Sequence, residues 1–123
     1  MKKVTPPIKI AVVDDDNMFL QMAAKIVMHN VHKNVLSFGC SKSALSHIEE
    51  NDSADIIISD INMPEMSGLE LLARIKRKYP AKVCIMMSGD PTNEESVREL
   101  GADGYLNKPF QASELSDLLR SFI

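Results

Sequence analysis

IKIAVVDDD, residues 8–16, carries an apolar run straight into three acidic residues. Within the run only Lys9 is polar, so the pattern does not alternate between apolar and polar positions. A strand over 8–13 with this pattern must be covered on both faces, as in parallel sheets with helices on either side. The three acids then lie just past the carboxyl end of that strand.

The same pattern returns along the chain. Short apolar runs at 34–38, 55–59, 82–87 and 104–106 predict four more strands. Stretches with helical spacing lie between them at about 16–30, 41–50, 67–78 and 90–101, and a fifth after the last strand carries Leu115, Leu118, Leu119 and Phe122. Five strands that alternate with five helices predict an α/β domain with a doubly wound parallel sheet.

Several predicted helices have recognisable end signals. Asp16 suits the N-cap of the first helix. Ser67 and Glu70 have the spacing of a capping box at the start of the third helix. Asp90-Pro91 suits the first turn of the fourth helix, and Gly101 suits a left-handed cap at its end.

Length and composition narrow the function. The chain has 123 residues, enough for one domain, which we assign to 8–123 after a flexible N-terminal segment at 1–7. It is 45% apolar and 25% charged, with a net charge of −3, which argues against direct nucleic-acid binding. No apolar run approaches the roughly 18 residues of a membrane span, and no signal-peptide pattern follows Met1, so we expect a cytoplasmic protein without membrane contact. Cys40 and Cys84 show neither metal-ligand spacing nor a clear disulfide pattern.

Polar side chains follow four of the predicted strands: Asp14, Asp15 and Asp16; Asp60 and Asn62; Ser88 and Asp90; and Lys108. In an open α/β sheet, ligands bind beyond the carboxyl ends of the strands. Clustered carboxylates repel one another unless a cation is bound. Oxygen ligands without histidine or thiolate suit Mg²⁺ best, with Mn²⁺ and Ca²⁺ as alternatives. A carboxylate beside that metal is a candidate nucleophile toward a phosphoryl donor.

Each of these residues also has an ordinary structural explanation. Aspartates cap helices, Asp60 could belong to a turn, and most serines and lysines simply face water. The joint placement of acids, hydroxyl and lysine at four strand ends favours a functional site over these separate explanations.

In its motifs the chain resembles the receiver domains of two-component response regulators, including the chemotaxis regulator. The motifs are VVDDD at 12–16, DINMPEMSG at 60–68, Ser88-Gly89, and GYLNKPF at 104–110. The resemblance extends from Ile8 to about Phe122. It implies a flavodoxin-like (βα)5 fold with sheet order 2-1-3-4-5.

The resemblance also implies a role for each matching residue. Asp60 is the expected phosphoacceptor, and Asp14, Asp15, Asp60 and the backbone carbonyl of Asn62 are the expected Mg²⁺ site. Ser88 and Lys108 would contact the phosphoryl group, with a cis bond before Pro109. Ser88 and Tyr105 would form the conformational switch.

The implied activity is that of a self-phosphorylating signalling switch rather than an ordinary enzyme, with slow autodephosphorylation. The donor would be a phosphohistidine on a histidine kinase or a histidine phosphotransfer domain, as in a phosphorelay, and an effector downstream would read the switch. Two departures from the family pattern are Ser67-Gly68 in place of Asp-Gly, and Gly89 where alanine is common. Glycine at 89 would give the switch loop additional backbone freedom.

Three alternatives remain open at this point. Asp14-Asp15-Asp16 contains the Asp-x-Asp of haloacid-dehalogenase-like phosphatases, with Asp14 as nucleophile, although Asn17-Met18 departs from that family. A flavodoxin-like electron carrier would need a phosphate loop after the first strand, which the sequence lacks. A receiver that only binds partners would not need the complete set of site residues.

Overall fold

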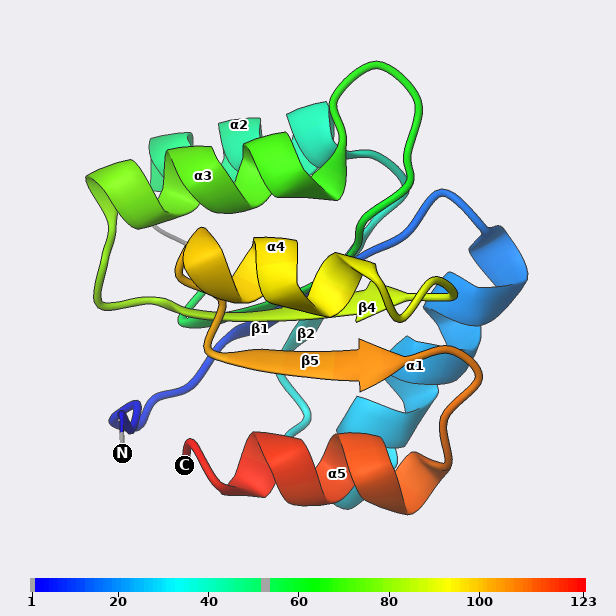
Figure 1. The fold of residues 1–123 in the computed structure, drawn as a ribbon. Coiled ribbons are helices and arrows are strands. Elements are labelled where there is room, and N and C mark those ends of the chain that lie inside the picture. The colour runs from blue at the N-terminus through cyan, green and yellow to red at the C-terminus, as the bar shows by residue number, and fades with distance from the viewer. Residues whose placement is uncertain (1, 52–53) are drawn as a thin grey trace.

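The computed structural model describes residues 2–51 and 54–123. Five strands and five helices alternate along the described chain (Figure 1). The strands are β1 (Ile10–Val13), β2 (Val35–Phe38), β3 (Ile56–Asp60), β4 (Val83–Ser88) and β5 (Gly104–Asn107). The helices are α1 (Asn17–Asn30), α2 (Ser41–Asn51), α3 (Gly68–Lys78), α4 (Asn93–Glu99) and α5 (Ala112–Arg120).

All strands are parallel and form one sheet in the order β2-β1-β3-β4-β5. This order confirms the predicted flavodoxin-like topology. The order reverses once, between β1 and β3, so the carboxyl ends of these two strands lie side by side. In register, Val13 pairs with Ser59, which brings the acids after β1 next to Asp60.

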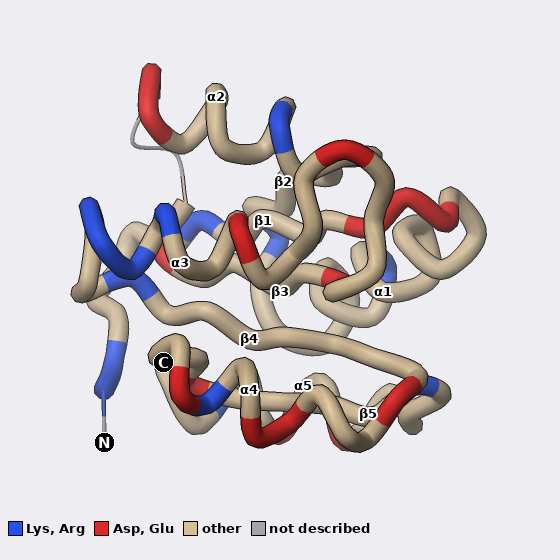
Figure 2. Tube along the Cα trace, turned by 45° about the horizontal axis from the view of Figure 1, so that its top comes forward, with Lys and Arg blue, Asp and Glu red and all other residues tan. Residues whose placement is uncertain are grey.

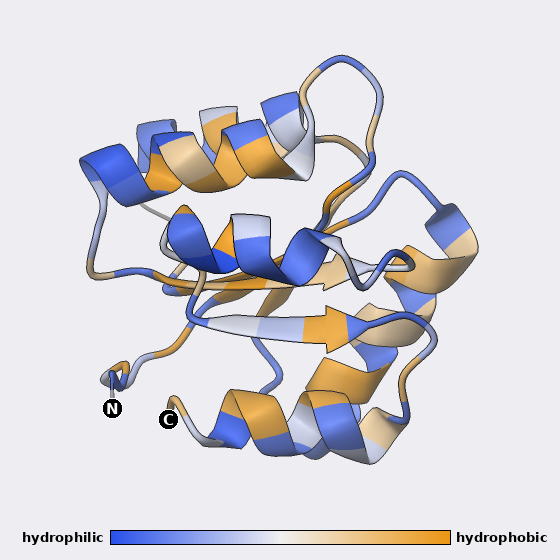
Figure 3. Cartoon of the chain, viewed as in Figure 1, coloured by the Kyte–Doolittle hydropathy of each residue, from blue (hydrophilic) through white to orange (hydrophobic). Residues whose placement is uncertain are grey.

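The sheet separates two apolar layers. Alternate residues of β1 point to opposite faces: Ala11 and Val13 pack with α2, α3 and α4, while Ile10 and Val12 pack with α1 and α5. The central strands are therefore buried on both faces, as their unbroken apolar sequences predicted. Figure 3 shows the apolar sides of α3 and α5 turned inward, whereas α4 is largely hydrophilic.

The helix ends agree with the predicted signals in part. Asp16 is the N-cap of α1, where its carboxylate accepts hydrogen bonds from the backbone N–H groups of Met18 and Phe19. Ser67 caps α3 by accepting from Glu70 N–H, and Gly101 has the expected positive φ of 98°. The fourth helix differs: it begins at Asn93, because Asp90 Oδ1 instead accepts hydrogen bonds from the backbone N–H and the hydroxyl of Thr92.

The N-terminal segment runs beside the C-terminus. Val4 N–H donates to the carbonyl of Phe122 at 2.7 Å, and Lys2 Nζ lies 3.2 Å from Asp103 Oδ1. Met1, which belongs to the predicted flexible segment, lies outside the described residues. Flexibility of residues 2–7 stays a prediction.

Candidate functional site

Three carboxylates gather at the carboxyl ends of β1 and β3. Asp14 and Asp15 follow β1, Asp60 ends β3, and each offers one oxygen such that all three oxygens lie within 4.8 Å of one another. Asp14 is completely buried, whereas 11% of the Asp60 side chain stays accessible and Asp15 is exposed. Figure 2 shows this acidic edge on the opposite side of the molecule from the basic end of α3. A small cation that enters from solvent can therefore contact one oxygen of each of the three carboxylates.

Lys108 reaches the same carboxylates from the end of β5. Its Nζ lies 2.7 Å from Asp14 Oδ2 and 3.2 Å from Asp60 Oδ1. The ammonium also lies over the ring of Phe19, 4.0 Å from the centroid. The peptide bond between Lys108 and Pro109 is cis, as the resemblance implied.

Burial raises the pKa of Asp60 above its ordinary value, and the negative charge of Asp14 adds to the shift, while Lys108 partly opposes it. Burial by itself would lower the pKa of Lys108. The hydrogen bond to Asp14 and the negative charge of Asp60 outweigh that effect, so the net shift is upward. Lys108 is therefore held as a cation beside the acids.

Asp14 and Asp60 differ in how their oxygens are used. Asp14 Oδ1 accepts a hydrogen bond from Asp16 N–H at 2.9 Å, and Asp14 Oδ2 accepts from Lys108. A completely buried carboxylate with both oxygens occupied is poorly placed to attack a substrate. This geometry disfavours Asp14 as the nucleophile of a phosphatase.

Both predicted switch residues are hydrogen-bonded to the loop between β4 and α4. Ser88, the last residue of β4, is completely buried, and its Oγ accepts from Asp90 N–H at 3.0 Å and from Asn93 Nδ2 at 2.9 Å. The Tyr105 hydroxyl donates to the carbonyl of Asp90 at 3.0 Å. One loop thus connects both predicted switch side chains.

Gly68 begins α3, directly after the loop that follows β3. Its N–H donates to the carbonyl of Ile61 at 2.8 Å. A Cβ at position 68 would overlap the carbonyl oxygen of Asp60. The start of α3 therefore packs directly on the backbone of the predicted phosphoacceptor. Asn62, whose carbonyl is the predicted fourth ligand, is exposed in this same loop.

Sequence reasoning missed two contacts at the site. Phe19 lies beneath Lys108, and Asn93 binds the Ser88 hydroxyl. Phe19 lies within the predicted helix at 16–30, where an apolar residue indicates packing only, and Asn93 belongs to none of the motifs. Both contacts join segments that are distant along the chain or separated by a loop, so no local pattern could mark them.

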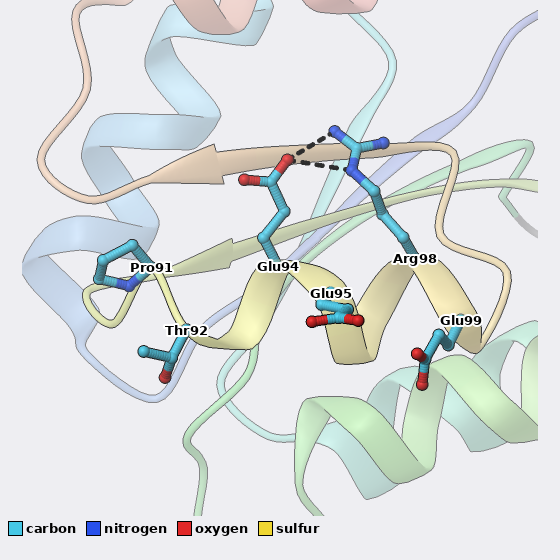
Figure 4. Close-up of a pocket in the computed structure, with 6 residues that line it drawn as sticks. All are labelled: Pro91, Thr92, Glu94, Glu95, Arg98 and Glu99. Carbon is cyan, nitrogen blue, oxygen red and sulfur yellow. Dashed lines mark hydrogen bonds and ion pairs between the residues drawn. The ribbon is translucent and has the colours of Figure 1, made fainter.

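A surface hollow lies away from the acids, along the outer side of α4 (Figure 4). Its lining includes Pro91, Thr92 and Glu95, and an ion pair between Glu94 and Arg98 at 2.9 Å. The hollow is lined by one continuous segment, α4 and the two residues before it, and it lacks groups that converge from several strand ends as at the acidic edge.

Comparisons with known proteins show which family the chain resembles in sequence and fold. A family model described as response regulator receiver domain matches residues 10–120. A two-component response regulator from Arabidopsis thaliana, ARR11, is 35% identical over 111 residues, which are 88% of this chain and 21% of that protein. A chemotaxis protein CheY homolog from Campylobacter jejuni is 29% identical over 119 residues, covering 94% of this chain and 92% of that protein.

Among solved structures, a response regulator receiver domain protein from Clostridium thermocellum superposes with a TM-score of 0.86. It is 33% identical, and the match covers 94% of each chain. Sequence, fold and structural likeness together define a receiver domain of the two-component response regulator class. The chain belongs to the response regulator receiver domain family.

Two further facts bear on the whole protein. The chain spans about a fifth of the length of the plant regulators that it matches. None of the helices in the described part of the chain is long and apolar enough to cross a bilayer.

Proposed function

We propose that Asp60 accepts a phosphoryl group from a phosphohistidine donor, on either a histidine kinase or a histidine phosphotransfer domain. The observation that carries this assignment is the contrast between the two buried acids. Asp60 keeps an opening to solvent next to Lys108, whereas both oxygens of Asp14 are already bound within the protein. Of these two buried acids, Asp60 is thus the one that a large donor can approach.

The donor set fits a magnesium ion, with manganese as the alternative. Asp14, Asp15 and Asp60 would supply carboxylate oxygens, and the carbonyl of Asn62 would complete the protein's share. The site offers hard oxygen ligands without a soft donor, which is the chemistry that these ions prefer. When bound, the ion would supply positive charge next to the phosphoryl oxygens.

The chain's own residues then account for the transfer. Asp60 attacks the phosphorus while the bond to the donor nitrogen breaks, in line and through a loose transition state. Lys108, held as a cation between Asp14 and Asp60, balances the charge on the phosphoryl oxygens. Ser88 donates its hydroxyl proton to one of these oxygens, and Tyr105 follows the movement of the loop.

The switch itself is a shift between two arrangements of α4 and β5. Phosphorylation biases this equilibrium, and an effector reads the face that it exposes. Water then removes the phosphoryl group slowly from Asp60 without a second protein. Asn62 and Asp90 are exposed beside the site, and we expect replacements at these positions to change the rate of that hydrolysis.

The direct test is labelling with a small acyl-phosphate donor in the presence of Mg²⁺, followed by intact-mass analysis. Wild type should gain one phosphoryl group, and Asp60→Asn should gain none. Asp117→Asn, which changes an exposed acid of α5, is the matched control and should label like wild type. Labelling that persists in Asp60→Asn but disappears in Asp14→Asn would contradict the assignment.

A further inference from the structure

The hydroxyl of Ser88 is held by a side chain that none of the sequence motifs includes. Asn93, the first residue of α4, donates from Nδ2 to Ser88 Oγ at 2.9 Å. The N–H of Asp90 donates to the same oxygen at 3.0 Å. A serine oxygen has two lone pairs for accepting hydrogen bonds, so these two donors occupy both.

This arrangement opposes the movement that the proposed function requires. The described residues include no hydrogen bond from Ser88 Oγ to Asp60 or Lys108; its own proton points to the carbonyl of Asp90 at 3.3 Å. A hydroxyl that turns toward a phosphoryl group on Asp60 must leave at least one of its two donors. The amide of Asn93 is the donor that belongs to a different element.

The same amide links the last residue of β4 directly to the first residue of α4. The N-cap residue Thr92 makes no capping hydrogen bond with its side chain, and Val97 is the buried residue of this seven-residue helix. The Tyr105 hydroxyl is bound to the same loop, at the carbonyl of Asp90. The backbone N–H of Asn93 also donates to the carbonyl of Asp90 at 3.1 Å, so breaking the bond between Ser88 and Asn93 would loosen the first turn of α4 at the moment when Ser88 moves.

We propose that Asn93 is a latch, a positioning residue that holds the Ser88 hydroxyl away from the phosphoryl site and couples its release to the start of α4. The inference rests on the proposed function of Asp60 and deepens it by assigning a regulatory role to this residue. A purely structural role for Asn93 would stabilise α4 without affecting the affinity of the acidic site.

The first experiment measures the affinity for beryllofluoride, which attaches to a carboxylate oxygen as a phosphoryl group would. Titrations with Mg²⁺ present, followed by ¹⁹F NMR, should show that Asn93→Ala binds about two- to tenfold tighter than wild type, which is the effect of one hydrogen bond. Ser96→Ala is the matched control, since it changes an exposed polar residue of α4 to alanine, and it should bind like wild type.

A double-mutant cycle separates the latch from a general effect on the helix. In a Ser88→Ala background the latch has nothing to hold, so Asn93→Ala should change the beryllofluoride affinity less than twofold. An equal gain in both backgrounds, or no gain in Asn93→Ala relative to Ser96→Ala, would overturn the proposal.

A metal-free measurement distinguishes failure of the latch from failure of the proposed function. The side-chain amide protons of Asn93 should exchange with water more slowly than those of exposed Asn107, and Ser88→Ala should remove the difference. If wild type bound no beryllofluoride, the proposed function would fail, while this exchange difference would still report the hydrogen bond. Rapid exchange of the Asn93 amide in wild type would overturn the latch by itself.

Discussion

Gly68 begins α3 directly against the backbone of Asp60, and this contact leads to the first prediction. A methyl group at position 68 would overlap the Asp60 carbonyl oxygen and lie 2.8 Å from the Cα of Ile61. Because backbone atoms cannot step aside as a flexible side chain can, Gly68→Ala should cost about 3 kcal/mol of unfolding free energy. The backbone of Asp60 would have to move to relieve the overlap, and this displacement should slow acyl-phosphate labelling of Asp60. Urea denaturation and the labelling rate measure the two effects.

Gly89 is the matched control for that substitution. A Cβ at position 89 would meet nothing within 4 Å, and the backbone there does not have a positive φ. Gly89→Ala should change the unfolding free energy by no more than about 0.5 kcal/mol. Equal losses in the two alanine variants would show that the close approach at position 68 is not the cause.

Asp103 gives the second residue-scale prediction, one that depends on pH. Its carboxylate accepts from Cys84 N–H at 2.9 Å and from Lys76 Nζ at 2.6 Å, with Lys2 3.2 Å away. Burial alone would raise the pKa of Asp103, but the hydrogen bonds from Lys76 and Cys84 outweigh it, so the net shift is downward. Asp103→Ala should lower the unfolding free energy by about 2 kcal/mol at neutral pH.

The sign of the pH dependence follows from that lowered pKa. An acid whose pKa is lower in the folded state stabilises the protein above its unfolded value, near 3.8, and this contribution is lost as the pH falls through the folded value. The difference in unfolding free energy between wild type and Asp103→Ala, measured by urea denaturation, should therefore become smaller below about pH 4. Asp117→Ala removes an exposed acid and should have the same unfolding free energy as wild type at both pH values. A difference between Asp103→Ala and wild type that stayed as large in acid would contradict the lowered pKa as its cause.

At the scale of elements, α4 differs from the other helices in how little it buries. Val97 is its buried side chain, whereas α3 buries Gly68, Leu71, Leu72 and Ile75. Because local opening is cheaper where few apolar contacts are lost, backbone amides of α4 should exchange with deuterium faster than those of α3. Residue-resolved exchange by NMR checks this expectation. Equal protection in the two helices would argue against a mobile α4.

Most elements could be predicted because their signals are local. The strands β1, β3 and β4 are buried on both faces, so each appears in the sequence as an unbroken apolar run. The acids of the candidate site were predictable for a related reason, since they come directly after those runs. The predicted start of the fourth helix at Asp90 was wrong, because the side chain of Asp90 forms a turn with Thr92 that competes with the helix.

At the scale of the whole molecule, the charges are unevenly distributed. The acids Asp14, Asp15 and Asp60 meet at one edge, with Lys108 as the cation in direct contact with two of them. If Mg²⁺ binds there, a concentration of about 100 times its Kd should stabilise the fold by about 2.7 kcal/mol. Calorimetry with and without Mg²⁺ should show a higher Tm with the metal.

The exposed acid of the cluster allows a sharper version of this test. Asp15→Ala should raise the Tm of the metal-free protein, because it removes a repelling charge, and should reduce the rise that Mg²⁺ produces. Glu95→Ala removes an exposed acid from α4 and should leave the Mg²⁺-dependent rise intact. A metal-free Asp15→Ala protein that melted below wild type would show that the cluster carries no net repulsion.

The hydrogen bond from Val4 to Phe122 places the two ends of the fold next to each other, on the side away from the strand tips (Figure 1). A short linker could therefore join them, so that the polypeptide is reopened elsewhere as a circular permutant, or the whole domain could be spliced into a surface loop of a host protein. In either format the acidic edge would face outward and stay open to a phosphodonor. The fold is accordingly suited to serve as an insertable sensor module, in which phosphorylation is read through a reporter attached at the joined ends.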